Sequence, residues 1–291
     1  MQITVTRVVL QLLLMTASTT HAFAFVGIFQ RSFSSVVRGK TGTSTSRRAA
    51  VNAAFTLAQS RDEPSLSSTV SYFDRFLLPL KLCPFASRPL LTHPDECRIV
   101  PWPSGSGLTL SEETDSLLSC IDEEAKLLSS LSLSSTTPPP RLTSIIVILP
   151  PPPPPPSSSS SLVSPPPSPS SSSLYSQLSS FRSFMSFINN RVSTLPSMSS
   201  HPSALQTLAF HPRFTFSGSK SVDVGNYVNR SPHPMIHLLR EEEVTKAIES
   251  WEKSGKDMAA IWEGNKDKME SLGIAGVRDL LYLKKPTTSP D

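Results

Sequence analysis

Residues 144–149 read Ser-Ile-Ile-Val-Ile-Leu, and this stretch decides the fold that the sequence predicts. An unbroken run of β-branched residues is typical of a strand that is buried on both faces. Two further short strands are expected, over residues 98–102 and 204–210. Because helical patterns separate the three strands, we expect an α/β protein with a small, mostly parallel sheet of about three strands.

Apolar residues at helical spacing lie between and after these strands. The clearest pattern runs from Leu174 to Val192, where apolar residues follow one another at steps of four and three. Thr109 and Glu112 have the spacing of a capping box, and Ser231-Pro232 reads as an N-cap followed by Pro at the first helical position. Further helices are therefore expected over residues 70–80, 109–128, 231–251 and 258–272.

The N-terminal residues have the composition of targeting signals. Residues 1–22 combine an early Arg, a short apolar run and small residues, which is the pattern of a secretory signal peptide. Residues 23–61 are rich in Ser, Thr and Arg and contain no acid, which is typical of a disordered transit peptide. Together they resemble the bipartite presequence of algae with secondary plastids, in which a Phe follows the cleavage point, as Phe23 does here. A plastid location is expected, with secretion or mitochondrial import as the alternatives.

The net charge depends on this N-terminal region. The chain has 27 Lys and Arg against 23 Asp and Glu, a formal charge of +4. Residues 1–61 hold seven of the basic residues and none of the acidic ones, so the rest has 20 against 23, a net charge of −3. A nucleic-acid partner is not expected, because such proteins carry a basic surface. The apolar run near the N-terminus is shorter than a membrane-spanning helix needs, so no stable membrane insertion is expected after processing.

A second low-complexity segment interrupts the rest of the chain. Residues 136–173 contain 14 of the 28 prolines together with runs of Ser. Such a composition buries little apolar surface, so this insertion is expected to be disordered, and an SH3- or WW-type partner for it is not favoured. Residues 62–291 are thus expected to form a single α/β domain around the insertion.

Polar and turn-forming residues gather in three motifs. The first, Leu82-Cys83-Pro84-Phe85-Ala86, follows the first expected helix. The second covers residues 210–218, at the end of the third expected strand, and the third covers residues 226–241. Because ligands of α/β sheets bind beyond the carboxyl ends of the strands, we expect a small-molecule site between the three motifs.

These motifs resemble those of the bacterial family known as domain of unknown function 1415. The resemblance extends from about Val70 to Gly273, apart from the insertion, and includes Asn265 in the last expected helix. Two departures stand out, at His233, where the family usually has Tyr, and at Leu149-Pro150, where it has His-Pro. No activity accompanies this family, so the resemblance implies kinship rather than chemistry.

Cys83 and His211 are the candidate catalytic residues. A cysteine with a lowered pKa is a nucleophile, and a histidine at the end of a strand can serve as its base. The alternatives are a buried structural thiol at Cys83 and a His211 side chain that fixes the following turn. The Cys-Pro-Phe-Ala motif is also similar to that of omega-class glutathione transferases, but there the motif opens a helix, whereas here it follows one.

Arg230 is the centre of a candidate anion site. It lies one residue before the expected N-cap, where backbone N–H groups, the helix dipole and a guanidinium favour a bound carboxylate or phosphate. The alternative is a structural loop in which Arg230 pairs with Asp223 or Glu241. The residues expected to bind the ligand are Asn226, Tyr227, Asn229, Arg230, Ser231, His237 and Arg240.

Two classes of function remain open on this basis. The protein is expected to be a transferase or hydrolase of a small anionic metabolite, or a non-catalytic ligand-binding or scaffold protein. A weaker alternative is a zinc protein, because His233 and His237 lie four apart on an expected helix and His211 could supply a third nitrogen. No cofactor or metal is part of the leading prediction, and the sequence leaves open whether the protein is an enzyme.

Overall fold

The computed structural model describes residues 55–83, 85, 97–105, 108–130, 143–151, 173–199, 205–255 and 258–282. The expected signal peptide lies outside the described residues, as does the expected transit peptide up to residue 54. Most of the expected insertion lies outside them as well.

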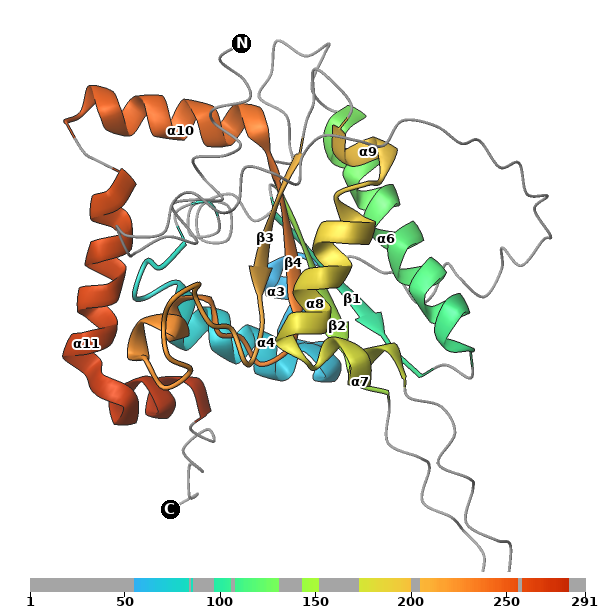
Figure 1. Ribbon diagram of the computed structural model, residues 1–291, viewed down its shortest axis with the longest axis horizontal. Coiled ribbons are helices and arrows are strands. Elements are labelled where there is room, and N and C mark those ends of the chain that lie inside the picture. The colour runs from blue at the N-terminus through green and yellow to red at the C-terminus, as the bar shows by residue number, and fades with distance from the viewer. Residues whose placement is uncertain are drawn as a thin grey trace, which may run out of the picture.

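Four strands form one mixed sheet in the order β1-β2-β4-β3 (Figure 1). β1 pairs with β2 in parallel, whereas β4 pairs antiparallel with both β2 and β3. Helices accompany this sheet, so the expected mixture of helix and strand is confirmed, but the expectation of three mostly parallel strands is not. The strands are β1 (Cys97–Pro103), β2 (Thr143–Leu149), β3 (Leu205–Phe210) and β4 (Met235–Arg240).

The strand β4 replaces the first part of the helix that was expected over residues 231–251. Ser231 and Pro232 lie in a turn, and the helix α10 (Glu241–Lys253) begins only after the strand. All six residues of β4 are buried, because the strand lies between β2 and β3 and has helices against both faces. A short apolar run of this kind fits a buried helix and a buried strand equally well, so its spacing misled the prediction.

Helices cover both faces of the sheet. One face packs on α6 (Leu110–Ser130) and on α8 (Phe181–Phe187), which follows α7 (Leu174–Leu178). The other face packs on α4 (Ser67–Tyr72), on α10 and on α11 (Met258–Tyr282). The remaining elements are α3 (Leu57–Ser60), η1 (Pro64–Leu66), the π-helical η2 (Phe73–Leu77) and η4 (Ile188–Val192), α9 (Pro196–Ser199) and the 3-10 helix η5 (Val224–Asn229).

Local signals in the sequence hold for several of these helices. The expected capping box is present before α6, where Thr109 N donates to Glu112 Oε2 at 2.8 Å and Glu112 N donates to Thr109 Oγ1 at 3.4 Å. The helix expected over residues 174–192 is broken, because Ser180 has an extended backbone and separates α7 from α8. The apolar spacing thus predicts the buried face correctly but does not detect the break.

The fold begins within the range expected for the transit peptide. Phe55 extends the outer edge of β1, since Phe55 N donates to Ile99 O at 2.8 Å and Ile99 N donates to Phe55 O at 2.7 Å. Leu57 is buried in the core, and Arg61 forms an ion pair with Asp74 at 2.8 Å. Residues 55–61 therefore belong to the folded part of the chain.

The range expected for the insertion also contains a structural element. β2 lies inside residues 136–173 and is buried along its whole length. Its β-branched residues pack on both helical layers, so the proline-rich composition on either side does not extend through it. The range given for the insertion therefore includes β2, the strand that the β-branched run over residues 144–149 predicts.

Candidate functional site

The second and third motifs meet at the edge of the sheet where β1, β2 and β3 end. His211 directly follows β3, and its backbone N–H donates to Asn229 O at 3.1 Å. Asn229 Nδ2 in turn donates to Ala209 O at 3.2 Å. This edge lies at the bottom of Figure 1, where α4, α7 and the last part of α11 are also found.

Cys83 lies at the opposite edge of the sheet. Burial and, after it, the neighbouring Cys83 raise the pKa of Cys97, which is the first residue of β1. Phe85 packs on Trp251 of α10, with ring centres 6.1 Å apart, and α10 follows the end of β4 at that same edge. Asn265 Nδ2 holds the turn through Leu82 O at 2.8 Å. The structure therefore does not bring Cys83 and His211 together as nucleophile and base.

His211 is a structural histidine in this arrangement. Its ring is buried between Phe181 and Phe184, and burial lowers its pKa, so the ring is neutral at pH 7. Nε2–H donates to Leu178 O at 2.9 Å, while Nδ1 accepts from Arg213 N at 2.9 Å. Because both ring nitrogens are engaged, neither is free to accept a proton from a nucleophile.

The asparagines and the serine of the third motif bind their own loop. Asn226 Oδ1 accepts from Phe216 N at 2.9 Å and from Ser219 Oγ at 2.7 Å, and its Nδ2 donates to Lys220 O at 2.7 Å. Ser231 Oγ donates to His233 O at 2.6 Å. These side chains satisfy the backbone of an irregular segment, as buried polar groups must.

His237 and Arg240 lie on β4 and point away from a common site with Arg230. His237 is fully buried, its Nε2 binds Thr143 Oγ1, and burial lowers its pKa to about 3. Arg240 ends the strand at the opposite edge, where Nη2 lies 3.4 Å from Glu242 Oε2. The prediction that these two residues share a ligand with Arg230 depended on a helix that is a strand instead.

The same correction applies to the zinc hypothesis. His233 lies before β4 and contacts Ser68 and Tyr175, whereas His237 lies within β4 and binds Thr143 at the start of β2, so the two rings do not converge as they would on a helix. Within the described part of the chain, no three His, Cys, Asp or Glu side chains are placed to hold a metal ion.

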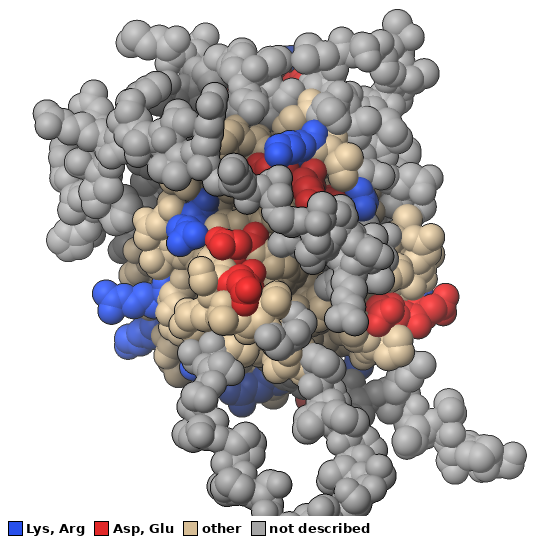
Figure 2. Space-filling view, turned by 90° about the vertical axis from the view of Figure 1, so that its right-hand side faces the viewer, with Lys and Arg blue, Asp and Glu red and all other residues tan. Residues whose placement is uncertain are grey.

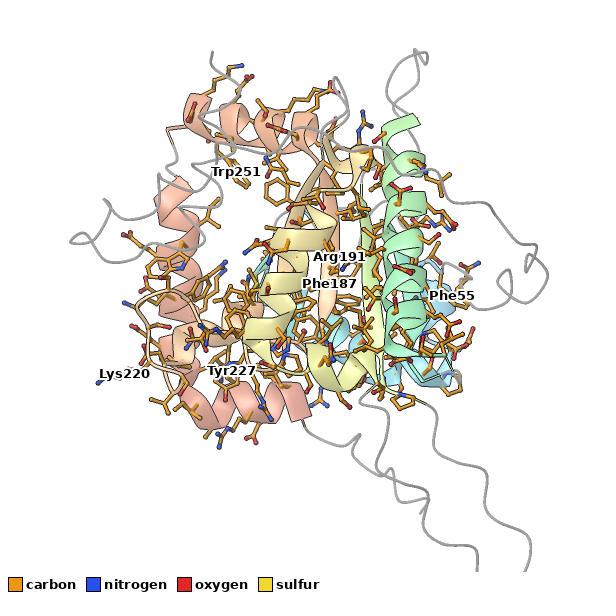
Figure 3. All side chains as sticks on the ribbon, turned by 45° about the vertical axis from the view of Figure 1, so that its right-hand side comes forward. Phe55, Phe187, Arg191, Lys220, Tyr227 and Trp251 are labelled. Atoms are coloured by element: carbon orange, nitrogen blue, oxygen red, sulfur yellow. The ribbon has the colours of Figure 1, made fainter. Side chains whose placement is uncertain are left out.

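Arg230 does not lie at the start of a helix, as expected, but in a loop whose carbonyl groups it binds. Nε donates to Phe214 O at 3.1 Å and Nη2 donates to Ser221 O at 2.5 Å, so the expected pairing with Asp223 or Glu241 does not form. Its guanidinium carbon lies 4.3 Å from the centre of the Tyr227 ring. In Figure 3, Tyr227 lies beside the last part of α11.

Arg278 completes this group and was not predicted. Its Nε donates to Tyr227 Oη at 3.4 Å. α11 reaches Tyr227 because Gly273 has φ 64° and ψ 172°, which bends the helix back under η5. This φ favours glycine, so Gly273 was the one available signal that the chain changes direction there.

Comparison with known proteins identifies one relationship. Residues 173–279 match the model of a family whose description reads "Protein of unknown function (DUF1415)". The match confirms the resemblance seen in the second and third motifs, and it includes Arg278 but not Cys83. Nothing among curated proteins or solved structures matches the chain.

Proposed function

We propose that the protein, whose residues 173–279 match the DUF1415 family model, binds a small carboxylate or phosphate at Arg230 and Arg278, and that this site is not catalytic. One observation carries the proposal. Two guanidinium groups converge on the buried Tyr227, Arg230 over its ring at 4.3 Å and Arg278 at its hydroxyl at 3.4 Å. Paired arginines offer an anion several charge-assisted hydrogen bonds in fixed directions.

Arg230 is prepared for such a ligand by its own contacts. Two of its nitrogens bind loop carbonyls, and stacking on Tyr227 fixes the plane of the guanidinium. Among the described residues, Nη1 of Arg230 has no hydrogen bond and the side chain forms no ion pair with a carboxylate. A cation that is already ordered loses little side-chain entropy when it binds an anion.

The arrangement favours binding over catalysis by the predicted residues. Cys83 lies at the other edge of the sheet, and both nitrogens of His211 are engaged with the backbone. A transferase or hydrolase that uses this pair would need both side chains at the anion. Neither contacts Arg230 in the described structure, so binding without catalysis is the better supported role of the site at Arg230 and Arg278.

Thermal unfolding of the protein in phosphate tests this proposal. Phosphate at about 100 times its Kd is expected to stabilise the protein by about 2.7 kcal/mol over the same concentration of chloride. Arg278→Gln should abolish this difference, because Arg278 is exposed on α11 and its loss removes charge without opening the core.

The matched control is Arg182→Gln, which removes an exposed arginine from α8 on another part of the surface. It should keep the full phosphate effect. Equal stabilisation of the Arg278 and Arg182 variants, or none in the unaltered protein, would show that this is not an anion site.

We further propose that the protein acts in the plastid, guided by the part of the expected presequence that precedes the described fold, residues 1–54. The acid-free composition of that region supports import. A fluorescent protein fused after this region should enter the plastid of an alga that has secondary plastids. Accumulation in the medium or in mitochondria would contradict the proposal.

The partner is proposed to be a small molecule rather than a nucleic acid. On the face shown in Figure 2, acidic and basic side chains of the described residues lie interspersed and form no basic surface. None of the helices in the described ranges combines the length and the apolar character that crossing a bilayer requires.

A further inference from the structure

Three side chains far apart in the sequence meet at the edge of the sheet beside which α4 and α7 lie in Figure 1. Ser68 lies on α4, Tyr175 on α7, and His233 in the turn that precedes β4. Ser68 Oγ is 2.9 Å from His233 Nε2, and Tyr175 Oη is 3.4 Å from His233 Nδ1. The imidazole is therefore held between a serine hydroxyl on one nitrogen and a phenol on the other.

These contacts are compatible with an arrangement of protons that suits catalysis. When Nδ1–H donates to Tyr175 Oη, Nε2 carries the lone pair and accepts the hydrogen bond of Ser68. A nucleophile within hydrogen-bond reach of a base, with the base oriented by a third group, is the pattern of an activated serine. The tautomer is assigned from these partners.

We propose that Ser68 is a nucleophile, with His233 as its general base, that hydrolyses small carboxylic esters. Ser68 Oγ attacks the ester carbonyl while its proton passes to His233 Nε2. The bond between the acyl carbon and the alkoxy oxygen then breaks, and His233 returns the proton to the leaving alcohol. Water, deprotonated by His233, hydrolyses the acyl-serine and regenerates the hydroxyl, so no oxidant or cofactor takes part.

Accessibility distinguishes His233 from the structural histidines. Ser68 is exposed and His233 is half-buried, whereas His211 and His237 are fully buried. Burial is the cause that lowers the pKa of His233, so the imidazole is neutral and able to accept a proton at pH 7. Burial also raises the pKa of Tyr175, the titratable side chain that contacts the ring, so the phenol keeps its proton.

A buried carboxylate holds Tyr175 in position. Glu113 on α6 accepts from Ser104 Oγ at 3.1 Å and from Leu174 N at 2.5 Å. Tyr175 N donates to Ser104 Oγ at 3.2 Å. Because Glu113 is only 2% exposed, this connection fixes the start of α7, and with it the orientation of Tyr175 toward His233. Tyr175 is a positioning residue in this proposal. The proposal does not depend on the anion site at Arg230 and Arg278.

Labelling with a fluorophosphonate probe tests the inference on the full chain. The probe should form a bond between phosphorus and Ser68 Oγ with loss of fluoride, located by mass spectrometry of peptides. Ser68→Ala should abolish the label. His233→Gln, which keeps a hydrogen-bonding group near Ser68 but cannot act as base, should slow labelling by about 100-fold. In both variants, the release of p-nitrophenol from p-nitrophenyl acetate should fall together with the labelling.

The control is Ser65→Ala, which removes another exposed serine, from η1 just before α4, and should leave labelling unchanged. The labelling rate of the unaltered protein should fall only at a pH below the ordinary histidine pKa, since burial lowers the pKa of His233. Tyr175→Phe should move this midpoint to lower pH, because the imidazolium loses an acceptor. No label at Ser68, or equal labelling rates in the folded His233→Gln variant, would overturn the inference.

Discussion

Asn226 and Arg230 show how the polar side chains of the third motif are used. Asn226 binds three groups of the turn that follows β3, and Arg230 binds two carbonyl oxygens of the same loop. The sequence predicts ligand contacts for both, but an irregular loop leaves its backbone polar groups without regular partners. Among the described contacts of Arg230, Nη1 has no hydrogen-bond partner after the loop is satisfied.

The pH dependence of stability follows from His237. Its pKa falls from 6.5 to about 3 on folding because the ring is fully buried, so the unfolded chain takes up a proton first as the pH drops. Stability is therefore complete above pH 6.5 and falls between pH 6.5 and 3. Urea unfolding at pH 7.5 and pH 5 should show a loss of about 2 kcal/mol from this residue.

His237→Leu is the variant that separates this effect from other titrating groups. It should make the stability less dependent on pH, while His211 and His233, whose pKa values are also lowered, still contribute in the same direction. A slope between pH 7.5 and 5 that is unchanged in His237→Leu would contradict the assignment.

Some helices and strands of this chain are indicated by a short sequence pattern of their own, and others are not. β2 has a β-branched run and α6 has a capping box, and both were predicted close to their observed bounds. β4 has neither, and its identity as a strand depends on β2 and β3, which lie beside it. The break in α11 at Gly273 has a local cause, a backbone conformation that other residues adopt only with strain.

Two glycines of α11 allow a matched prediction. Gly273→Ala should destabilise the protein by about 1–3 kcal/mol, because its φ of 64° with ψ of 172° is strained for alanine. Gly264→Ala should stabilise it by up to about 1 kcal/mol, since Gly264 is helical and a Cβ there meets no atom within 4 Å. Thermal unfolding of both variants checks the signs.

The bend at Gly273 also connects stability with the anion site. If the bend positions Arg278 at Tyr227, the folded Gly273→Ala variant should lose much of the phosphate stabilisation and Gly264→Ala should keep it. Two variants with the same phosphate response would mean that the bend has no part in binding.

At the scale of the whole molecule, residues 55–61 form the first described part of the fold. A chain that begins at Asp62 lacks the two hydrogen bonds between Phe55 and Ile99, the buried Leu57 and the ion pair of Arg61 with Asp74. It should be less stable than a chain that begins at Ala50 by about 2–4 kcal/mol, mostly from the exposed apolar surface. Equal urea midpoints for the two chains would show that this segment contributes nothing.

The candidate sites could be predicted only in part, because the residues that meet in them lie far apart in the sequence. His211 was expected at a strand end beside the third motif, and it contacts Asn229 there. Cys83 was expected beside it, but the sequence does not tell at which edge of the sheet the turn after the first helix lies. Ser68, Tyr175 and His233 have no fixed spacing that would have indicated their contact.

The sequence by itself determined the existence of most helices and of three strands, the family of residues 173–279 and the positions of its turn-forming motifs. These features follow from side chains that act on their own backbone or on residues three or four positions away. Only the tertiary structure decided that residues 235–240 are a central strand, that Arg278 returns to Tyr227, and that a serine meets a histidine. Strand pairing and packing join distant residues, and their free energy is set by partners that no local pattern contains.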